Sequence, residues 1–167
     1  MATALDASVD TLDDAERAFV ANIREHGWFR TSVFAEADKP GFSFTTGFFV
    51  TQKVPEIVIF SMKDEFAHTV FWNIFNDAAD GVMLPVGIRT DEVFSNNPAY
   101  LFQIDKSKYQ QYLGWSRWFY GNDDFPSLQL VWSDQAGSFP WEDGFDETFR
   151  EDQPDLTEKG WLASIVG

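Results

Sequence analysis

The chain has 167 residues, with 27 acidic and 12 basic side chains, so its formal net charge is −15. That length fits one domain with a core of its own. The lack of cysteine excludes disulfides, thiolate metal sites and thiol nucleophiles, and two histidines exclude a three-histidine metal centre. The sequence holds no basic patch, so nucleic acid is not an expected ligand.

The N-terminal segment lacks the pattern of an export signal. Its first basic residue is Arg17, and no continuous apolar run of signal-peptide length is present. No window approaches the roughly 18 consecutive apolar residues of a membrane span, and anionic lipid headgroups repel an acidic protein. We therefore expect a cytoplasmic protein with no membrane partner.

The first expected element is a helix that follows a flexible tail over residues 1–9. Thr11 begins this helix, and Asp14, three positions on, completes a variant of the capping box. Apolar side chains then recur at helical spacing. Gly27 follows the last turn and is suited to end the helix in the left-handed conformation.

Strand-like runs come next. Trp28–Glu36 and Phe42–Val50 flank residues 37–41, which have the composition of a turn, and together they predict a β-hairpin. The following run, Ile57–Phe60, is continuously apolar. Such a run is typical of a central strand that is covered on both faces.

The second half mixes helices and strands irregularly. Asp64 is expected to cap a helix with the cleanest helical spacing of the chain, which Gly81 ends. Further expected elements are a strand weakened by its proline, two short strands and a third helix: Val82–Ile88, Tyr100–Asp105, Leu128–Trp132 and Ser107–Tyr120. The interleaving predicts an α+β fold, a single domain over residues 10–167 with a mainly antiparallel sheet and about three helices.

Short motifs follow one another along most of the chain. They are Gly27-Trp28, Phe44-Thr45-Thr46-Gly47, Pro55-Glu56-Ile57-Val58, Leu128-Gln129-Leu130-Val131-Trp132, Asp134, Gly137, Phe139-Pro140-Trp141-Glu142 and Gln153-Pro154-Asp155-Leu156. This order and spacing, over about residues 10–157, resembles the bacterial domain-of-unknown-function family 4262. Thr46 and Ser133 depart mildly from the family pattern, where an apolar residue and a proline are usual. The resemblance implies no established activity.

Side chains suited to catalysis are sparse. Asp64 lies one helical turn before His68, but a helix cap beside an imidazole is favoured over a two-ligand metal site, and His26 suits the negative end of a helix. Adjacent acidic pairs in the loops are expected to point into water. Neither Asp134 nor Asp143 begins a calcium-binding loop, because the third position is apolar in both registers. We expect no catalytic residue, no metal and no cofactor.

Thr45, Thr46, Gly47 and Glu56 form the first group of candidate binding residues. A glycine at a strand end lets a backbone or a ligand approach closely, and a buried hydroxyl at Thr46 needs a hydrogen-bond partner. The functional interpretation is a pocket floor with a carboxylate. The favoured interpretation is a β-bulge and a carboxylate that accepts backbone hydrogen bonds, since buried polar groups are commonly structural.

Asp134, Trp141 and Gln153 form the second group. Asp134 is suited to turn the chain by accepting from amides two residues on. Trp141 either covers the core or is an exposed recognition aromatic, and the covering role is favoured. Gln153 is a candidate binding residue because it begins the last motif of the family resemblance, Gln153-Pro154-Asp155-Leu156.

The leading hypothesis is a non-catalytic recognition domain whose acidic surface binds a basic protein. Immunity proteins that neutralise basic toxins share this charge character, as an analogy. The segment from Glu142 to Lys159 contains eight acidic and two basic residues. A contiguous acidic surface near Glu142–Glu158 would support this hypothesis, whereas scattered acidic residues would indicate solubility alone. The oligomeric state stays open.

The alternative hypothesis is a small-ligand or flavin-binding protein or enzyme. Its pocket involves Thr45, Thr46, Glu56 and Asp134, lined by aromatic side chains. Few basic residues are near enough in the sequence to hold a cofactor phosphate: Lys53, Lys63 and Arg89.

Overall fold

One five-stranded β-sheet organises the chain, and the computed structural model describes residues 2–166. The strands are β1 (Phe29–Val33), β2 (Phe42–Thr46), β3 (Glu56–Phe60), β4 (Ala99–Gln103) and β5 (Ser127–Trp132). They lie in the order β1-β2-β3-β5-β4, and every neighbouring pair is antiparallel except β3 with β5. The predicted α+β domain with a mainly antiparallel sheet is confirmed, as is the hairpin.

Within residues 2–166 there are six α-helices, so the expectation of about three was wrong. The helices are α1 (Asp14–His26), α2 (Phe48–Gln52), α3 (Asp64–Ala79), α4 (Tyr109–Tyr112), α5 (Gly114–Tyr120) and α6 (Trp161–Ser164). The unexpected ones, α2 and α6, have five and four residues. Helices this short depend on tertiary contacts and leave no periodic pattern in the sequence.

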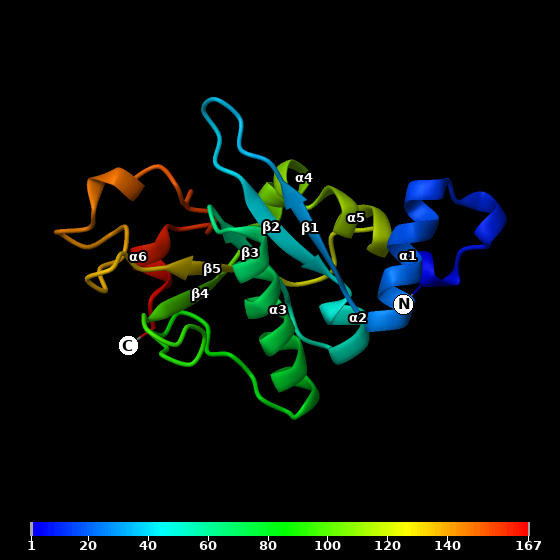
Figure 1. Cartoon of the computed structure of the whole chain (residues 1–167), viewed down its shortest axis with the longest axis horizontal. Coiled ribbons are helices and arrows are strands. Elements are labelled where there is room, and N and C mark those ends of the chain that lie inside the picture. The colour runs from blue at the N-terminus through cyan, green and yellow to red at the C-terminus, as the bar shows by residue number, and fades with distance from the viewer. Residues whose placement is uncertain (1, 167) are drawn as a thin grey trace.

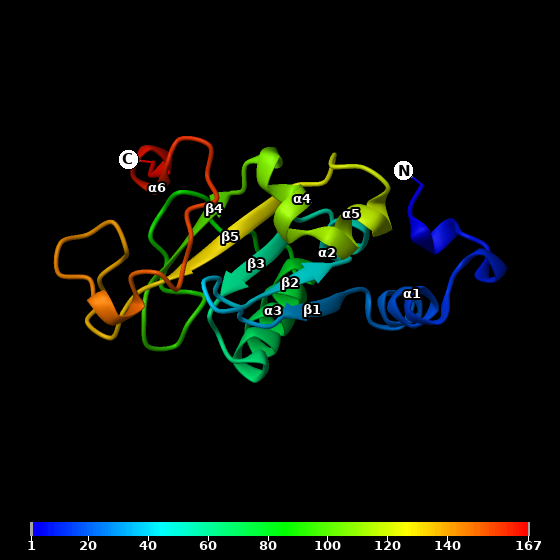
Figure 2. The ribbon, with the colours of Figure 1, turned by 90° about the horizontal axis from the view of Figure 1, so that it is seen from above.

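Helices cover both faces of the sheet (Figure 1). Seen from above, α3 lies on one side of the sheet, and α4 and α5 lie on the other (Figure 2). The central strand β3 serves both layers. Ile57 and Ile59 belong to the apolar cluster that contains Phe71 of α3, whereas Val58 belongs to the cluster around Phe119 of α5. The prediction of a central strand covered on both faces is therefore confirmed.

The first helix begins later than predicted. α1 starts at Asp14 rather than Thr11, because Asp13 and Glu16 form the capping box: each side chain accepts a hydrogen bond of 2.8 Å from the other's backbone N–H. The end is as predicted, since Gly27 caps the helix with a φ of 88°.

Two predicted strands need correction. The run Phe42–Val50 leaves the sheet after Thr46, because Gly47 turns the chain into α2. The run Val82–Ile88 forms no strand. Its Pro85 lacks an N–H for strand pairing, and the segment meets β4 through one backbone hydrogen bond from Gly87 N to Leu101 O of 2.7 Å.

Two helix predictions also change in detail. The expected helix over Ser107–Tyr120 is a 3-10 turn at Lys106–Lys108 followed by α4 and α5, which meet where Leu113 departs from helical geometry with a ψ of 40°. Asp64 is the first residue of α3 and not its cap, a position that Lys63 occupies.

The expected tail contains local structure in its described part. Ala4–Asp6 and Val9–Thr11 form 3-10 turns, and the guanidinium of Arg24 donates to the carbonyl oxygen of Leu5 over 2.8 Å. The flexibility of residues 1–9 stays a prediction, and Met1 lies outside the described residues. Among the helices of residues 2–166, none combines the length and apolar character that crossing a membrane requires.

Candidate functional site

The carboxylate of Glu56 lies fully buried where β3 begins, beside the N-terminus of α2. One oxygen, Oε1, accepts from Thr45 Oγ1 at 2.7 Å and from Phe48 N at 3.1 Å. The other, Oε2, accepts from Gly47 N and Phe49 N, both at 3.1 Å. Glu56 therefore satisfies backbone donors that the first turn of a helix leaves without an intrahelical partner.

Two hydroxyl groups connect the carboxylate to further backbone donors. Tyr120 donates its hydroxyl proton to Oε2 of Glu56 and accepts from Val50 N at 3.2 Å. Thr45 Oγ1, which donates to Oε1, accepts from Ile57 N at 3.0 Å. Both chains of hydrogen bonds end on the carboxylate, an arrangement in which each bond polarises the next.

The environment shifts the pKa values of both acidic groups. Burial raises the pKa of Glu56 above its ordinary value of 4.5, and hydrogen bonds from Tyr120, Thr45 and the backbone oppose that rise. Burial and the adjacent Glu56 charge raise the pKa of the Tyr120 hydroxyl far above 10, so Tyr120 stays a donor at neutral pH. Five donors occupy the roughly four lone-pair positions of a carboxylate, which leaves none for a substrate.

Thr46 and Gly47 are also taken up by the fold. Ser116 Oγ donates to the carbonyl of Thr45 at 3.2 Å, so Thr46 Oγ1 is the donor in the 2.6 Å hydrogen bond between the two side-chain hydroxyls. Gly47 has a φ of 117°, and a Cβ there would lie 2.4 Å from the carbonyl oxygen of Gly27. The close approach that a glycine permits is made here by backbone and not by a ligand.

Asp134 turns the chain after β5. Its Oδ1 accepts from Ala136 N at 3.0 Å and Ser138 N at 2.9 Å, and its Oδ2 accepts from Asp146 N at 3.0 Å. These backbone donors, that of Ser138 first, hold the pKa of the Asp134 carboxyl below its ordinary value. The predicted turn is present and also draws residue 146 against it.

Trp141 and Gln153 hold the C-terminal segment to the sheet. The Trp141 ring stacks on Phe139 with centroids 5.0 Å apart and contacts Trp161 at 5.6 Å, so it covers an aromatic cluster as favoured. The amide of Gln153 donates to Trp132 O and accepts from Trp132 N, both at 3.0 Å. Gln153 thus pairs with the end of β5 as a neighbouring strand does.

The structure brings together one of the two candidate groups as a unit. Thr45, Thr46 and Glu56 are fully buried and hydrogen-bonded around the start of α2. Glu56 pairs with Ser127 on the parallel strand β5, seven positions before Asp134. At about 3.3 Å per residue, seven positions along a strand span about 23 Å. Asp134 is therefore too far from Thr45, Thr46 and Glu56 to form one pocket with them.

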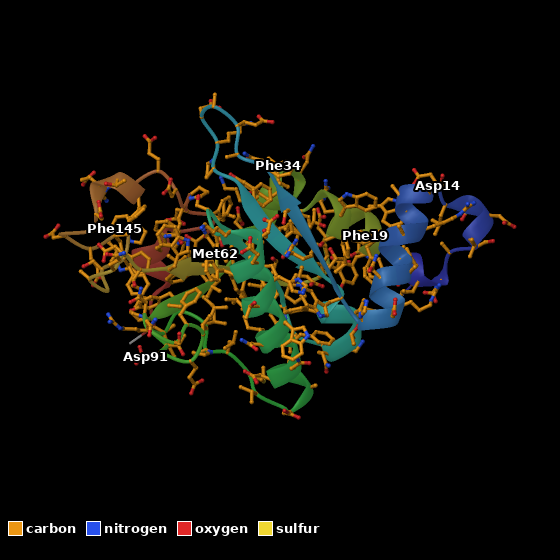
Figure 3. The ribbon with its side chains drawn as sticks, in the orientation of Figure 1. Asp14, Phe19, Phe34, Met62, Asp91 and Phe145 are labelled. Carbon is orange, nitrogen blue, oxygen red and sulfur yellow. The ribbon has the colours of Figure 1, made fainter. Side chains whose placement is uncertain are left out.

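Sequence reasoning missed an acidic hollow of about 830 Å³ beside the hairpin. It lies between the loop that joins β1 to β2 and residues 151–152, and Figure 3 labels two of its lining residues, Phe34 and Met62. Five acidic residues line it with one cation, Lys39: Glu36, Asp38, Asp64, Glu151 and Asp152. The sequence shows the acidic run between Glu142 and Lys159, but the fact that part of it lines one hollow with the hairpin loop is a long-range feature that no local pattern reveals.

A second hollow, of about 480 Å³, lies between α1, β1 and α3. The two histidines of the chain, His26 and His68, both line it. They are 42 positions apart (68 − 26), so spacing alone could not connect them. Among residues 2–166, no group of three or more histidine, cysteine, aspartate or glutamate side chains is placed to hold a metal ion.

Comparison with known proteins identifies the family of the chain. The model of a family described as "Domain of unknown function (DUF4262)" matches residues 22–146. No curated protein and no solved structure matches the chain. The family match includes the whole sheet, the Glu56 network and the Asp134 turn, and it spans most of the sequence. The protein therefore belongs to the family of domains of unknown function DUF4262.

Proposed function

We propose that this protein is a non-catalytic recognition domain that binds a basic protein through the acidic hollow. The observation that carries the proposal is the convergence of five acidic side chains and a single lysine on one concave surface. Opposite charges speed association and exclude wrong partners. The net charge of −15 adds a long-range attraction toward any cationic partner.

The hollow joins two parts of the sequence that are more than a hundred residues apart. Glu36 and Lys39 pair their backbones at the hairpin loop, with hydrogen bonds of 3.0 and 3.1 Å. On the opposite wall, Ser61 Oγ donates to the carbonyl oxygen of Asp152 over 2.7 Å. These contacts position the backbone of both walls, whose acidic residues line a common volume.

Most of this negative charge has no cation beside it. Asp64 lies 3.9 Å from the guanidinium of Arg30, but no ion pair within residues 2–166 involves Glu36, Asp38 or Glu151. Like charges on a shared concave surface repel one another, and lysine or arginine side chains of a partner would relieve that repulsion.

An aromatic side chain stands at the rim of the hollow. Phe34, on the hairpin loop, lines the hollow and is 86% exposed. Large exposed aromatics are typical anchors of protein interfaces. The expected partner surface therefore presents basic side chains beside an apolar one.

Further acidic side chains are exposed or half-buried along the C-terminal segment. Each of the acidic residues between Glu142 and Glu158 is exposed or half-buried. The one basic residue among them, Arg150, is already paired with Glu147 at 2.5 Å. A recognition role predicts that these side chains extend the acidic surface of the hollow, whereas scattered charge would serve solubility alone.

A defined peptide tests the proposal. A fluorescein-labelled peptide of alternating arginine and leucine residues is titrated with the protein, and fluorescence anisotropy is measured at low and at physiological salt. The double variant Glu36→Gln/Glu151→Gln is expected to weaken binding by about threefold to tenfold, as two exposed ion pairs imply. Added salt is expected to weaken wild-type binding more than variant binding, since fewer charges are then screened in the variant.

The matched control removes the same number of charges elsewhere. Asp77 and Asp80 lie at the end of α3 outside the hollow and are exposed. The double variant Asp77→Asn/Asp80→Asn is expected to bind the peptide as the wild type does. Equal weakening in both double variants contradicts the proposal, because net charge alone then accounts for binding.

A further inference from the structure

The hollow between α1, β1 and α3 differs in charge from the rest of the molecule. The chain carries 27 acidic residues, yet no acidic residue within positions 2–166 lines this hollow. Its polar lining comes from Arg30, His26, His68 and the amides of two asparagines, Asn22 and Asn76. A lining with one arginine, two imidazoles and two amides, and with no carboxylate, suits an anion better than a cation.

The walls of the hollow are aromatic. The Trp28 ring stacks on the His68 ring, with centroids 5.2 Å apart and planes 27° apart, and lies 6.1 Å from Phe75. Trp28 is almost fully buried, whereas Trp72, on the α3 side, is 55% exposed. Flat aromatic walls favour a planar ligand, which stacks on them with centroids about 4.5–7 Å away.

Arg30 is the one fixed positive charge in this lining. Its Nη1 donates to the carbonyl oxygen of Asp64 at 3.0 Å, and its Nη2 lies 3.9 Å from the Asp64 carboxylate, too far for a hydrogen bond, while the side chain stays 25% exposed. Burial and the Arg30 charge lower the pKa of His68, so that imidazole is neutral at neutral pH. The Arg30 guanidinium therefore keeps hydrogen-bonding capacity that the protein does not use.

We propose that this hollow binds a small planar anion, an aromatic ring that carries one carboxylate. The ring stacks against the exposed Trp72, beside the buried Trp28, and the carboxylate binds Arg30 with help from the asparagine and histidine side chains. A volume of about 480 Å³ lies within the roughly 300–1,000 Å³ of small-molecule sites. This site shares no lining residue with the acidic hollow, although Arg30 lies 3.9 Å from Asp64 of that hollow, and the two proposals are tested with different variants.

Three probes that differ in one property each test the site. The probe 1-naphthoate has a planar ring and a charge, 1-naphthamide has the ring without the charge, and cyclohexanecarboxylate has the charge without the planar ring. Each is titrated into isotope-labelled protein, and nuclear magnetic resonance follows the indole N–H signals of Trp28 and Trp72. Saturable shifts of both signals are expected with 1-naphthoate. Each of the other two probes is expected to bind at least about tenfold more weakly.

Variants locate the binding. Arg30→Gln is expected to weaken 1-naphthoate binding about tenfold or more, as loss of a charge-assisted hydrogen bond implies. Trp72→Ala is expected to weaken it about threefold to tenfold through lost stacking. The controls Lys63→Gln and Phe66→Ala remove a cation and a 62% exposed aromatic ring that do not line the hollow, and neither is expected to alter affinity.

Two outcomes overturn the proposal. One is equal affinity for 1-naphthoate and 1-naphthamide, which removes the role of the charge. The other is the absence of saturable shifts at Trp28 and Trp72 in folded protein, which removes the site. Melting curves of each variant establish that the protein under titration is folded.

Discussion

At the level of single residues, the buried carboxylate of Glu56 connects β2, β3, α2 and α5. Its two oxygens accept from three consecutive backbone amides, Gly47 to Phe49, and from the hydroxyls of Thr45 and Tyr120. A helix of five residues has little stability of its own. The carboxylate therefore fixes where β2 ends and where α2 begins.

Glu56→Gln tests this role. Each carboxylate oxygen accepts at least one backbone N–H, so either orientation of the glutamine amide sets its NH₂ group against a backbone donor. We expect a loss of about 2–4 kcal/mol in the free energy of unfolding, since buried donors left unsatisfied cost about 1–3 kcal/mol each. Urea unfolding measures it. Glu65→Gln, at an exposed position of α3, is expected to change stability by less than about 0.5 kcal/mol.

The raised pKa of Glu56 predicts a pH dependence. A carboxyl with a raised pKa in the native state holds its proton at pH values where the unfolded chain has lost it. This contribution to stability is fully present below the ordinary pKa of 4.5 and is lost as the pH rises through the native value. The stability difference between wild type and Glu56→Gln is therefore expected to shrink as the pH rises above 4.5.

Unfolding free energies measured across that pH range at constant ionic strength check the prediction. Other titrating groups are common to both proteins and cancel in the difference. A difference that grows as the pH rises contradicts the assignment, because it shows that the five donors outweigh burial and lower the pKa of Glu56.

At the level of elements, local signals were predictable and long-range ones were not. The periodic helix α3, the Gly27 cap and the hairpin depend on residues near one another in the sequence, and they are present. The break after Thr46 depends on a carboxylate ten positions later, and apolar alternation through Phe48 and Val50 concealed it.

The candidate site shows the same limit. The sequence indicated Thr45, Thr46, Gly47 and Glu56 as a group, and the structure places them together. The two hollows could not be foreseen, because each is lined by elements that only the folded sheet brings side by side.

Gly47 provides a test of how closely these elements pack. It has a φ of 117°, and a Cβ would lie 2.4 Å from Gly27 O and 2.7 Å from Trp28 Cα. Gly47→Ala therefore adds a clash with the backbone to the strain of a left-handed alanine. We expect the free energy of unfolding to fall by about 3 kcal/mol or more, measured by thermal or urea unfolding. Gly81 is the control, because it has a φ of 84° and a Cβ added there would meet no atom within 4 Å.

Gly81→Ala is expected to cost about 1–2 kcal/mol, the strain of the left-handed conformation alone. The difference between the two variants isolates the contact of Gly47 with the backbone of Gly27 and Trp28. Equal losses in the two variants would mean that β2 and the end of α1 move apart readily.

At the level of the whole molecule, charge is distributed unevenly. The acidic hollow and the C-terminal acidic segment lie beside the hairpin loop, whereas the hollow lined by Arg30 and both histidines has no acidic lining residue within positions 2–166. Uniform negative charge would serve solubility. The two proposed sites, one for a basic protein and one for a small anion, lie in these two hollows.

The C-terminal segment packs against the sheet, although the family match ends at residue 146. Gln129, on β5 and fully buried, donates to Pro154 O at 2.6 Å and accepts from Leu156 N and Trp161 Nε1 at 3.3 Å. Leu156 and Trp161 are themselves buried. Without this segment, apolar side chains that it covers would be exposed, and burial of each large one contributes about 1.5–3 kcal/mol to stability. The buried amide of Gln129 would also lose its hydrogen-bond partners.

A chain ending at residue 146 is therefore expected to lose its cooperative unfolding transition, because this loss approaches the roughly 5–15 kcal/mol that stabilises a typical domain. A chain lacking residues 2–8 is the control. It loses the contact of Arg24 with Leu5 and partial burial of Ala4, so it is expected to unfold cooperatively with a loss of about 2 kcal/mol or less. Circular dichroism during thermal and urea unfolding separates the two. A cooperative transition in the chain ending at residue 146 would show that the sheet folds without its C-terminal cover.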